Sequence, residues 1–331
     1  QNNVYIKLYL IVKKETLNIC QVSLSGNIPI ILENYKNFSN LYTDINFYII
    51  CPKSQVYLFK KKLNHMNIYI ISEDQIVTFS NFKKISNNFL KNKNYYKKIQ
   101  PRLKWYYQQI LKISFVIDFI NKNKKNIIIW DADTIILKKI IFFENNTSIS
   151  YGTTSEYHKA YYETNQKILK KLPKYYISCL AQFISISIDE NNFLQKKLNN
   201  FKKRKGSTSH WLSNLVFKAI CDTHYNYNGS MFSEYELIGQ SNLIFKKNNQ
   251  KLISGLREEL NGKLTFTQKI ISKILGYSYI AYEHERSDIL SKNMLKRNQT
   301  WFFFMRLLIR KTSNKFFRGI KHIILEFIYG K

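Results

Sequence analysis

Short apolar runs alternate with amphipathic stretches through the first half of the chain. Residues 45–51 (INFYIIC) and 67–72 (NIYIIS) are continuous and β-branched, which is typical of buried strands in a parallel sheet. The segment SQVYLFKKKLN that follows Pro52 and residues 103–120 carry helical periodicity, and Pro101 can begin the second of these helices. Strands that alternate with helices predict an α/β fold with a mostly parallel central sheet flanked by helices.

Two further stretches of this half are harder to assign. Residues 81–99 are polar, rich in Lys, Asn and Tyr, and without a clear period, so we predict a mobile basic loop. The strand that opens the sheet is expected either in VYIKLYLIV, residues 4–12, or in NICQVSLS, residues 18–25. The pattern alone leaves both alternatives open.

The second half continues with strands at residues 148–152 and 182–188. Asp189 is expected to cap the helix that follows, and Ser207 or Thr208 to cap the next one. The sequence shows no internal repeat.

The run at residues 126–137 (NIIIWDADTIIL) differs from the other strands because it leads directly into Asp131 and Asp133. Two carboxylates one residue apart are costly at the end of a buried strand unless something neutralises them. At the carboxyl end of a strand in an open α/β sheet, that partner is usually a ligand or a metal. Carboxylate oxygens suit Mg²⁺ or Mn²⁺, whose other ligands include substrate phosphates. The run therefore predicts that the chain binds a phosphate-bearing donor through a divalent cation.

Composition changes near Asn261 and Gly262, where the chain becomes helical, aromatic and basic. We therefore predict one α/β domain over residues 1–262 and a helical extension over residues 263–331. The extension mixes aromatic residues and isoleucine with Lys and Arg at helical spacing, as in helices that lie on an anionic membrane. The alternative is a helix packed on the sheet with its basic face in water. The first interpretation predicts a cytoplasmic enzyme bound peripherally to the inner face of the cell membrane.

The formal charge of the 331 residues is +30, from 52 basic and 22 acidic side chains. Such an excess favours a polyanionic partner, which is nucleic acid, an anionic membrane or a phosphorylated substrate. An AT-rich genome would also enrich Lys, Asn and Ile without selection for a partner. A basic nucleic-acid-binding protein is the main alternative function, although no recognised nucleic-acid motif supports it.

Several familiar phosphate-binding and metal-binding motifs are absent from the sequence. No GxGxxG follows a strand and no GxxxxGK[ST] occurs, which argues against a Rossmann dehydrogenase and a P-loop NTPase. A DxD-type phosphatase is a closer alternative, but Ile135 occupies the place where that motif has Thr or Val. The four cysteines are far apart and form no CxxC pair. They are expected to be buried free thiols rather than a disulfide framework or a zinc site.

Three ordered stretches carry a resemblance to a known family: WYYQQILK at residues 105–112, IIIWDADTIIL at residues 127–137 and FSEYELIGQ at residues 232–240. Together they resemble a bacterial family of DUF-type, GT-A-fold glycosyltransferase-like proteins found among surface-polysaccharide genes. The resemblance implies a metal-dependent glycosyltransferase with Mn²⁺ or Mg²⁺. It would transfer a sugar from a nucleotide-diphosphate donor to a glycan or lipid-linked acceptor. The match covers roughly residues 45–245 in order and spacing.

The first stretch places Trp105, Gln108, Gln109 and Lys112 at the spacing of one helical face. Two amides and a lysine are unusual on a face that packs in a core. If the face lines a cleft, Gln109 can bond a sugar hydroxyl and Lys112 a diphosphate oxygen. The alternative is a partly solvated helix on which Lys112 extends its ammonium to water.

The resemblance also implies roles for the acidic residues. Asp131 and Asp133 would hold the metal on the donor diphosphate, with Asp133 as the direct ligand and Asp131 on the metal or the ribose. Such a metal would stabilise charge on the leaving nucleotide. His284, in YEHER, would be a late metal ligand, or else a surface or packing residue.

The stretch FSEYELIGQ adds two acids in a chain that has few of them. An inverting transferase needs a carboxylate to accept the proton of the acceptor hydroxyl, and Glu234 is our candidate for that base. Glu236 is the second candidate catalytic residue, as an acceptor contact or a structural partner. The alternative is a helix start, since Ser233 and Glu236 fit a capping box. Asp222 and His224 precede the stretch and are candidates to line the same cleft.

Overall fold

The central sheet is built from the β-branched runs of the sequence. In the computed structural model, five strands are ordered β3-β2-β1-β4-β9, and the first four are parallel to one another. The fifth strand is antiparallel to β4. The strands are β1 (Leu17–Val22), β2 (Ile45–Cys51), β3 (Ile68–Ser72), β4 (Ile127–Trp130) and β9 (Phe183–Ile186). The opening strand is therefore the second of the two alternatives that the sequence offered.

The structure describes most of the chain between residues 16 and 282. The described ranges are residues 16–64, 66–90, 96–152, 158–173, 177–198, 206–223, 230–247, 249–258 and 265–282.

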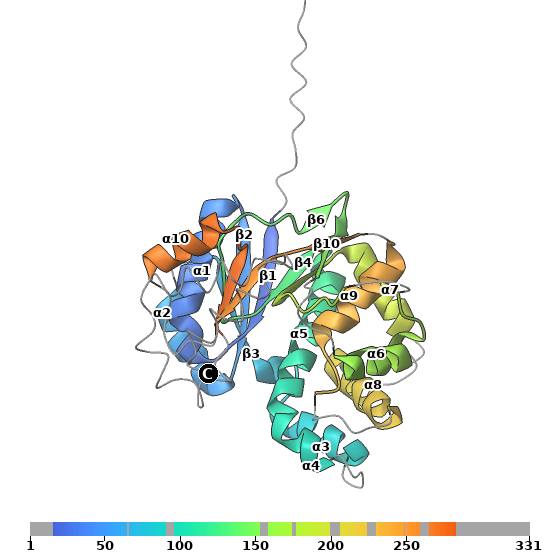
Figure 1. Ribbon diagram of the computed structural model, residues 1–331. Helices are drawn as coiled ribbons and strands as arrows, with labels where there is room; N and C mark the ends of the chain where they lie inside the picture. The colour runs from blue at the N-terminus through green and yellow to red at the C-terminus, as the bar shows by residue number, and fades with distance from the viewer. Residues whose placement is uncertain are drawn as a thin grey trace, which may run out of the picture.

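Helices cover both faces of the central sheet (Figure 1). One face packs on α1 (Ile28–Leu41) and α2 (Val56–Leu63) through a core that includes Ile19, Phe47 and Trp130. The other face packs on a larger group of helices through Cys20, Ile129 and Ile184. That group comprises α3 (Phe79–Leu90), α5 (Leu103–Asn123), α6 (Lys159–Leu169), α7 (Ile188–Leu198), α8 (Thr208–Asp222) and α9 (Glu234–Phe245). Alternate residues of each strand thus serve opposite faces, which confirms the predicted α/β class with a mostly parallel central sheet.

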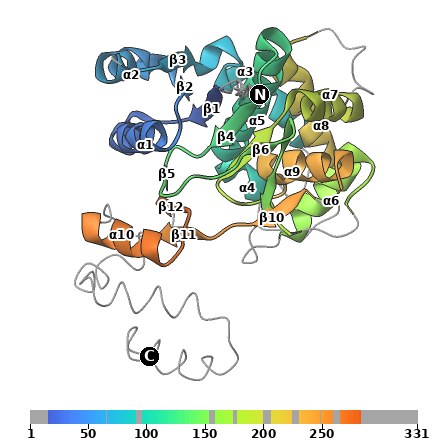
Figure 2. The same cartoon turned by 90° about the horizontal axis from the view of Figure 1, so that it is seen from above.

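Three small sheets extend the fold beyond the central one. Directly after the second aspartate of the DxD, β5 (Thr134–Ile136) pairs antiparallel with β12 (Tyr279–Tyr282), which pairs with β11 (Gly255–Glu258). The helix α10 (Phe266–Ile274) lies beside this three-stranded sheet (Figure 2). The remaining elements are β6 (Phe143–Glu144), β7 (Thr147–Ser148), β8 (Ser150–Gly152), β10 (Gln250–Leu252) and α4 (Tyr96–Ile99).

The described parts of residues 81–99, namely residues 81–90 and 96–99, are helical and do not form the predicted loop, while residues 91–95 lie outside the described ranges. The helix α3 crosses the first part of this stretch and α4 ends it. The buried residues Phe82, Ile85, Ser86 and Leu90 lie at i, i+3, i+4 and i+8, which is one helical face. Lys and Asn on the opposite face hid this period, and Phe82 owes its burial to packing against Phe217 of α8, 5.4 Å between ring centroids.

The predicted helix caps are partly right. Ser207 caps α8, because its side chain accepts a hydrogen bond from the backbone N–H of His210. Asp189 does not cap α7, because the helix begins one residue earlier and places Asp189 inside the first turn. Ser187 takes the capping role instead: its hydroxyl accepts from Glu190 N, and the Glu190 carboxylate accepts from Ser187 N at 2.9 Å.

Among the described residues beyond Gly262, β12 pairs antiparallel with β5. Residues 283–331 lie outside the described ranges, so the predicted amphipathic extension stays a prediction there. No helix of the described residues combines the length and apolar character needed to cross a membrane. The four cysteines are free thiols; three are buried, as predicted, and Cys221 is half-buried.

Candidate active site

The acidic pair lies where the strand order reverses. From β1 the chain continues to β2 and β3 on one side, whereas β4 lies on the other side of β1. Ligands of open α/β sheets bind in the crevice outside the carboxyl ends of the two strands at such a switch point. Trp130, the last residue of β4, is fully buried and stacks on Phe183 at 5.0 Å between ring centroids. The strand end is therefore fixed, and Asp131 and Asp133 follow it at this edge.

The loop after β1 forms the other side of the switch point, and the sequence interpretation missed it. Residues 23–26 (Ser-Leu-Ser-Gly) follow β1 directly and include the first two residues of a short 3-10 turn, Ser25–Asn27, that precedes α1. Leu24 is 52% exposed, and a Cβ on Gly26 would meet nothing within 4 Å. The signal that could have found this loop is a Ser/Gly cluster directly after an apolar strand.

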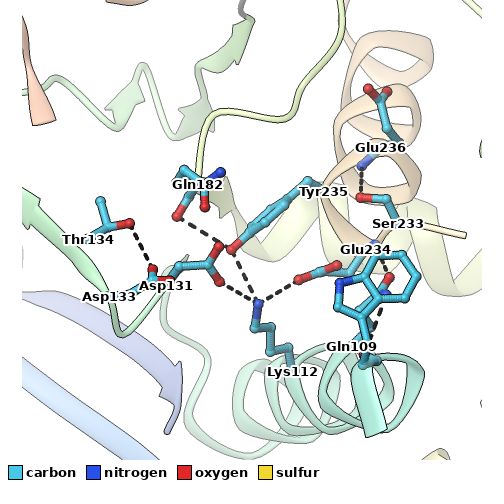
Figure 3. A network of polar contacts seen from close by, with 11 residues as sticks. Gln109, Lys112, Asp131, Asp133, Thr134, Gln182, Ser233, Glu234, Tyr235 and Glu236 are labelled. Carbon is cyan, nitrogen blue, oxygen red and sulfur yellow. Dashed lines mark hydrogen bonds and ion pairs between the residues drawn. The ribbon is translucent and has the colours of Figure 1, made fainter. Parts of the chain in front are cut away.

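Lys112 connects the three stretches that carry the family resemblance (Figure 3). Its ammonium Nζ donates to Asp131 Oδ1 at 2.6 Å and to Glu234 Oε1 at 2.7 Å. A third, longer contact of 3.3 Å reaches the hydroxyl of Tyr235, whose ring lies under the same ammonium. Residues separated by 19 and by 122 positions in the sequence therefore meet at one nitrogen atom.

Lys112 is a buried cation and not a solvated surface lysine. The residue is 7% exposed, which contradicts the alternative in which it extends to water. Burial by itself lowers the pKa of Lys112, but the charges of Asp131 and Glu234 outweigh burial and raise it above its ordinary value. The ammonium therefore stays charged and neutralises part of the acidic cluster.

The backbone around Asp131 is tied to a neighbouring loop. Asp131 N donates to the carbonyl oxygen of Gln182 at 3.0 Å, and the Tyr235 hydroxyl donates to the same oxygen at 3.4 Å. Gln182 has φ of 63°, the left-handed region that a non-glycine residue rarely adopts. This conformation turns the Gln182 carbonyl toward the site (Figure 3).

Asp133 has the least compensated charge of the cluster. Its carboxylate accepts from the Thr134 hydroxyl at 3.3 Å, and its backbone oxygen accepts from Tyr282 N at 3.1 Å. Burial raises the pKa of Asp133 to about 7, the Asp131 charge adds to this effect, and Lys112 opposes it. The positive charge of a cation beside Asp131 and Asp133 would offset both of these effects on the pKa, so the donor set fits a divalent metal.

Within the described ranges, no three His, Cys, Asp or Glu side chains lie close enough to hold a metal by themselves. Two carboxylates of the DxD suit an ion such as Mg²⁺, which is commonly bound by one or two carboxylates while substrate phosphates and water complete its shell. The predicted ligand His284 lies outside the described residues, as does His224.

The predicted face of α5 is only partly directed at the acidic cluster. Gln109 and Lys112 are buried, whereas Gln108 is exposed. The Gln109 side-chain oxygen accepts from the backbone N–H of Glu234 at 3.1 Å and so supports the start of α9. Trp105 is half-buried against Arg102, whose guanidinium carbon lies 5.3 Å from its ring centroid.

Glu236 occupies a different environment from Glu234. It is fully buried, and Oε1 accepts from the Ser178 hydroxyl and from Cys179 N at 3.1 Å. Its other oxygen accepts from Gln240 Nε2 at 3.2 Å. Burial raises the pKa of Glu236, and the hydrogen bonds from Ser178, Gln240 and Cys179 oppose that shift. These contacts favour the structural alternative for this residue.

The start of α9 also explains the rest of its sequence stretch. Ser233 caps the helix by accepting from Glu236 N, as the helix-start alternative predicted, while the Glu236 side chain binds residues 178–179 instead of returning to Ser233. A Cβ at Gly239 would lie 2.3 Å from Cys179 Sγ. Only glycine lets α9 approach this loop closely enough for the Glu236 contacts. Asp222, the last residue of α8, is exposed.

The arrangement defines a class: an α/β protein with an acidic, lysine-bridged site at the carboxyl edge of a mostly parallel sheet. A sequence profile described as "Family of unknown function (DUF6492)" matches residues 10–270. The chain belongs to this family.

One curated relative and several solved structures are also similar to the chain. Protein Ycf2 of Physcomitrium patens is 25% identical over 286 residues, and the match covers 74% of this chain but only 12% of that protein. Mouse xyloside xylosyltransferase 1 shares 9% identity with a TM-score of 0.39, covering 82% of this chain and 98% of that one. The galactosyltransferase LgtC, in complex with donor and acceptor sugar analogs, shares 9% identity with a TM-score of 0.38, covering 91% and 99%. At these values no residue role or substrate carries over from the relatives.

Proposed function

We propose that the protein is a metal-dependent glycosyltransferase of the GT-A-like type, which moves a sugar from a nucleotide-diphosphate donor to a glycan or lipid-linked acceptor. The observation that carries the proposal is the convergence on Lys112. Its ammonium joins Asp131 of the DxD strand end to Glu234 at the start of α9. The three stretches that resemble glycosyltransferase-like proteins thus meet at one ammonium, which supports a single site.

The donor is proposed to bind in the crevice at the carboxyl ends of β1 and β4. Two sides of this crevice are the loop of residues 23–26 and the acidic turn that holds Asp131 and Asp133. The switch-point position supports a phosphate-bearing ligand. The open space at Gly26 allows backbone approach to such a ligand without a side chain in the way.

Asp133, together with Asp131, would hold the divalent cation on the donor diphosphate. When bound, Mn²⁺ or Mg²⁺ would supply positive charge that stabilises the leaving nucleotide. Lys112 orients the Asp131 carboxylate through its 2.6 Å contact. The raised pKa of Asp133, to about 7 through burial and the Asp131 charge, supports a carboxylate that gains a partner on metal binding.

Glu234 is the proposed base of an inverting transfer. The acceptor oxygen would form the new bond to the anomeric carbon as the bond to the diphosphate oxygen breaks, and the hydroxyl proton would pass to the Glu234 carboxylate. Burial raises the pKa of Glu234, the charge of Lys112 opposes this shift and that of Asp131 adds to it. A raised pKa strengthens a carboxylate as a proton acceptor near neutral pH.

We also propose a biological role, a location in the cell and further ligand contacts, as the sequence suggested them. A role in surface-polysaccharide synthesis and a peripheral position on the inner face of the cell membrane would suit a lipid-linked acceptor. Gln108 and Trp105 stay proposed donor contacts, and His284 a proposed further metal ligand. The division into a domain of residues 1–262 and an extension is also proposed.

The proposal is tested by nucleotide release. The full chain is incubated with a panel of nucleotide sugars and Mn²⁺, and release of the nucleoside diphosphate is measured with and without a chelator. We expect release from at least one donor, dependent on the metal, and a loss of roughly 100-fold or more in Asp133→Ala.

Glu144→Ala is the matched control, because Glu144 is an exposed carboxylate paired only with exposed Lys251 in the described contacts. This variant should release nucleotide at the wild-type rate. If Asp133→Ala keeps both donor hydrolysis and metal-dependent nucleotide binding, the proposed mechanism is wrong.

A further inference from the structure

The helix α10 has the opposite polarity to that of an ordinary surface helix. Its buried positions are polar, namely Gln268 and Ser272. Three of its four large apolar side chains point outward: Phe266 is 78% exposed, Ile270 41% and Ile274 76%. These three residues lie at i, i+4 and i+8, so they form one continuous apolar stripe, here called the α10 stripe. Surface helices usually turn such a stripe toward the core.

The outward stripe is not the result of a loosely placed helix. Thr265 and Gln268 form a capping box at its start, in which each side chain bonds the other residue's backbone N–H. Lys269 forms an ion pair with Glu33 of α1, and Ile271 packs against the small core around Ile135 and Tyr277. These contacts fix the helix rotation and hold the stripe outward.

The helix is coupled to the acidic site through β12. This strand follows α10 and pairs with β5, whose first residue comes directly after Asp133. Tyr282, the last residue of β12, donates its backbone N–H to the Asp133 carbonyl oxygen. Whatever binds the stripe is therefore held at a fixed position relative to the DxD turn.

Positive charge accompanies the stripe. Lys273 is exposed in the last turn of α10, three residues after Ile270 and therefore on the same side of the helix. The whole chain carries a formal charge of +30. An apolar face flanked by lysine is complementary to the interface of a membrane with anionic lipid.

We propose that the α10 stripe inserts into the interfacial layer of an anionic membrane and docks the domain there. A protein partner is less suitable, because one ridge of a nine-residue helix is small against the 1,200–2,000 Å² or so that a stable protein interface buries. A membrane needs no complementary shape. Such docking goes beyond the proposed reaction. It would hold the DxD turn at a constant distance from the lipid surface, because β12 connects α10 to that turn.

The test uses the full chain and flotation with two kinds of vesicle, pure phosphatidylcholine and phosphatidylcholine containing about one third phosphatidylglycerol. We expect wild-type protein to bind the anionic vesicles, and Phe266→Ser/Ile274→Ser to bind at least about tenfold more weakly. Lys273→Gln should weaken binding by a smaller factor that disappears at high salt. Tyr57→Ser/Leu252→Ser is the matched control, because these side chains are 76% and 62% exposed and lie outside α10.

The control variant and Asp133→Ala should both bind vesicles like the wild type, which separates this inference from the proposed function. If the wild type ignores anionic vesicles, or if the α10 double variant binds them equally well, the proposal is overturned. A double variant that keeps vesicle binding but loses thermal stability or a self-associated state would instead show that protein covers the stripe, which also overturns it.

Discussion

Glu234 and Glu236 are two residues apart at the start of one helix, both are buried, and their surroundings differ in kind. Glu234 contacts the charged ammonium of Lys112 at 2.7 Å and lies beside the DxD turn. Glu236 is held by neutral donors, Ser178, Cys179 N and Gln240. The comparison shows that residue type and burial alone do not single out a candidate catalytic carboxylate. The charge of its partner and its place beside the DxD turn are what favour Glu234.

The two glutamates also differ in whether a bound ligand can replace their contacts. Lys112 shares one charge between Asp131 and Glu234, so an arriving cation or phosphate can take over part of that pairing. Glu236 instead holds the loop before Gln182 by accepting hydrogen bonds from it, and Gly239 lets α9 approach that loop. Glu234 therefore belongs to a cluster of charged groups, whereas Glu236 stabilises the loop and the helix that lie beside this cluster.

The largest expected effect separates the two glutamates by rate. Glu234→Gln should lower the rate of sugar transfer by about 10²–10⁴-fold, because the amide cannot accept the acceptor proton. The fold should persist, since Lys112 keeps its contact with Asp131. The rate is measured with the donor found in the nucleotide-release screen. A larger rate loss in Glu236→Gln than in Glu234→Gln would reverse the comparison.

The second largest expected effect is a loss of stability when Lys112, the cation that pairs with Glu234, is replaced. Lys112→Met should reduce the free energy of unfolding by about 3–5 kcal/mol, because it leaves the buried Glu234 and the partly buried Asp131 without their cation. Chemical denaturation monitored by circular dichroism measures this change. Lys269→Met is the control, since Lys269 pairs with the partly exposed Glu33 near the surface. Equal losses in both variants would remove the distinction between a buried and a peripheral ion pair.

The smallest of the three effects is the loss of stability expected when Glu236, which neutral donors hold, is replaced. Glu236→Ala should cost about 2 kcal/mol of unfolding free energy, because it leaves the hydroxyl of Ser178 and the N–H of Cys179 without an acceptor. Metal-dependent nucleotide binding by the folded fraction should stay within a few-fold of the wild type. Loss of nucleotide binding without loss of stability would place Glu236 in the site.

Local patterns predicted much of this fold because each buried strand carries its own signal. The β-branched runs of β2, β3 and β4 and the periodic stretch of α5 were assigned from a few neighbouring residues. The helix α3 was missed because its apolar face is narrow and finds its partners on a helix more than 100 residues later. Tertiary packing, and not propensity, decides that segment.

The same contrast between local pattern and tertiary packing applies to the candidate site. Asp131, Asp133, Lys112 and Glu234 were predicted from residue type, spacing and the family resemblance, but the meeting of Asp131 and Glu234 at the Lys112 ammonium is a long-range property of the fold. The Gln109 contact with Glu234 N and the left-handed Gln182 were not predictable, because both depend on backbone positions set by other elements. The loop of residues 23–26 acquires meaning only from the strand order.

The most direct test of the account is a calorimetric titration of the preferred nucleoside diphosphate into wild-type protein and into Asp133→Asn, each with and without Mn²⁺. We predict tight binding only for the wild type with Mn²⁺, and a loss of at least tenfold in affinity when either Mn²⁺ or the Asp133 carboxylate is removed. Equal affinity in all four titrations would contradict the assignment of Asp131 and Asp133 as the metal-dependent donor site.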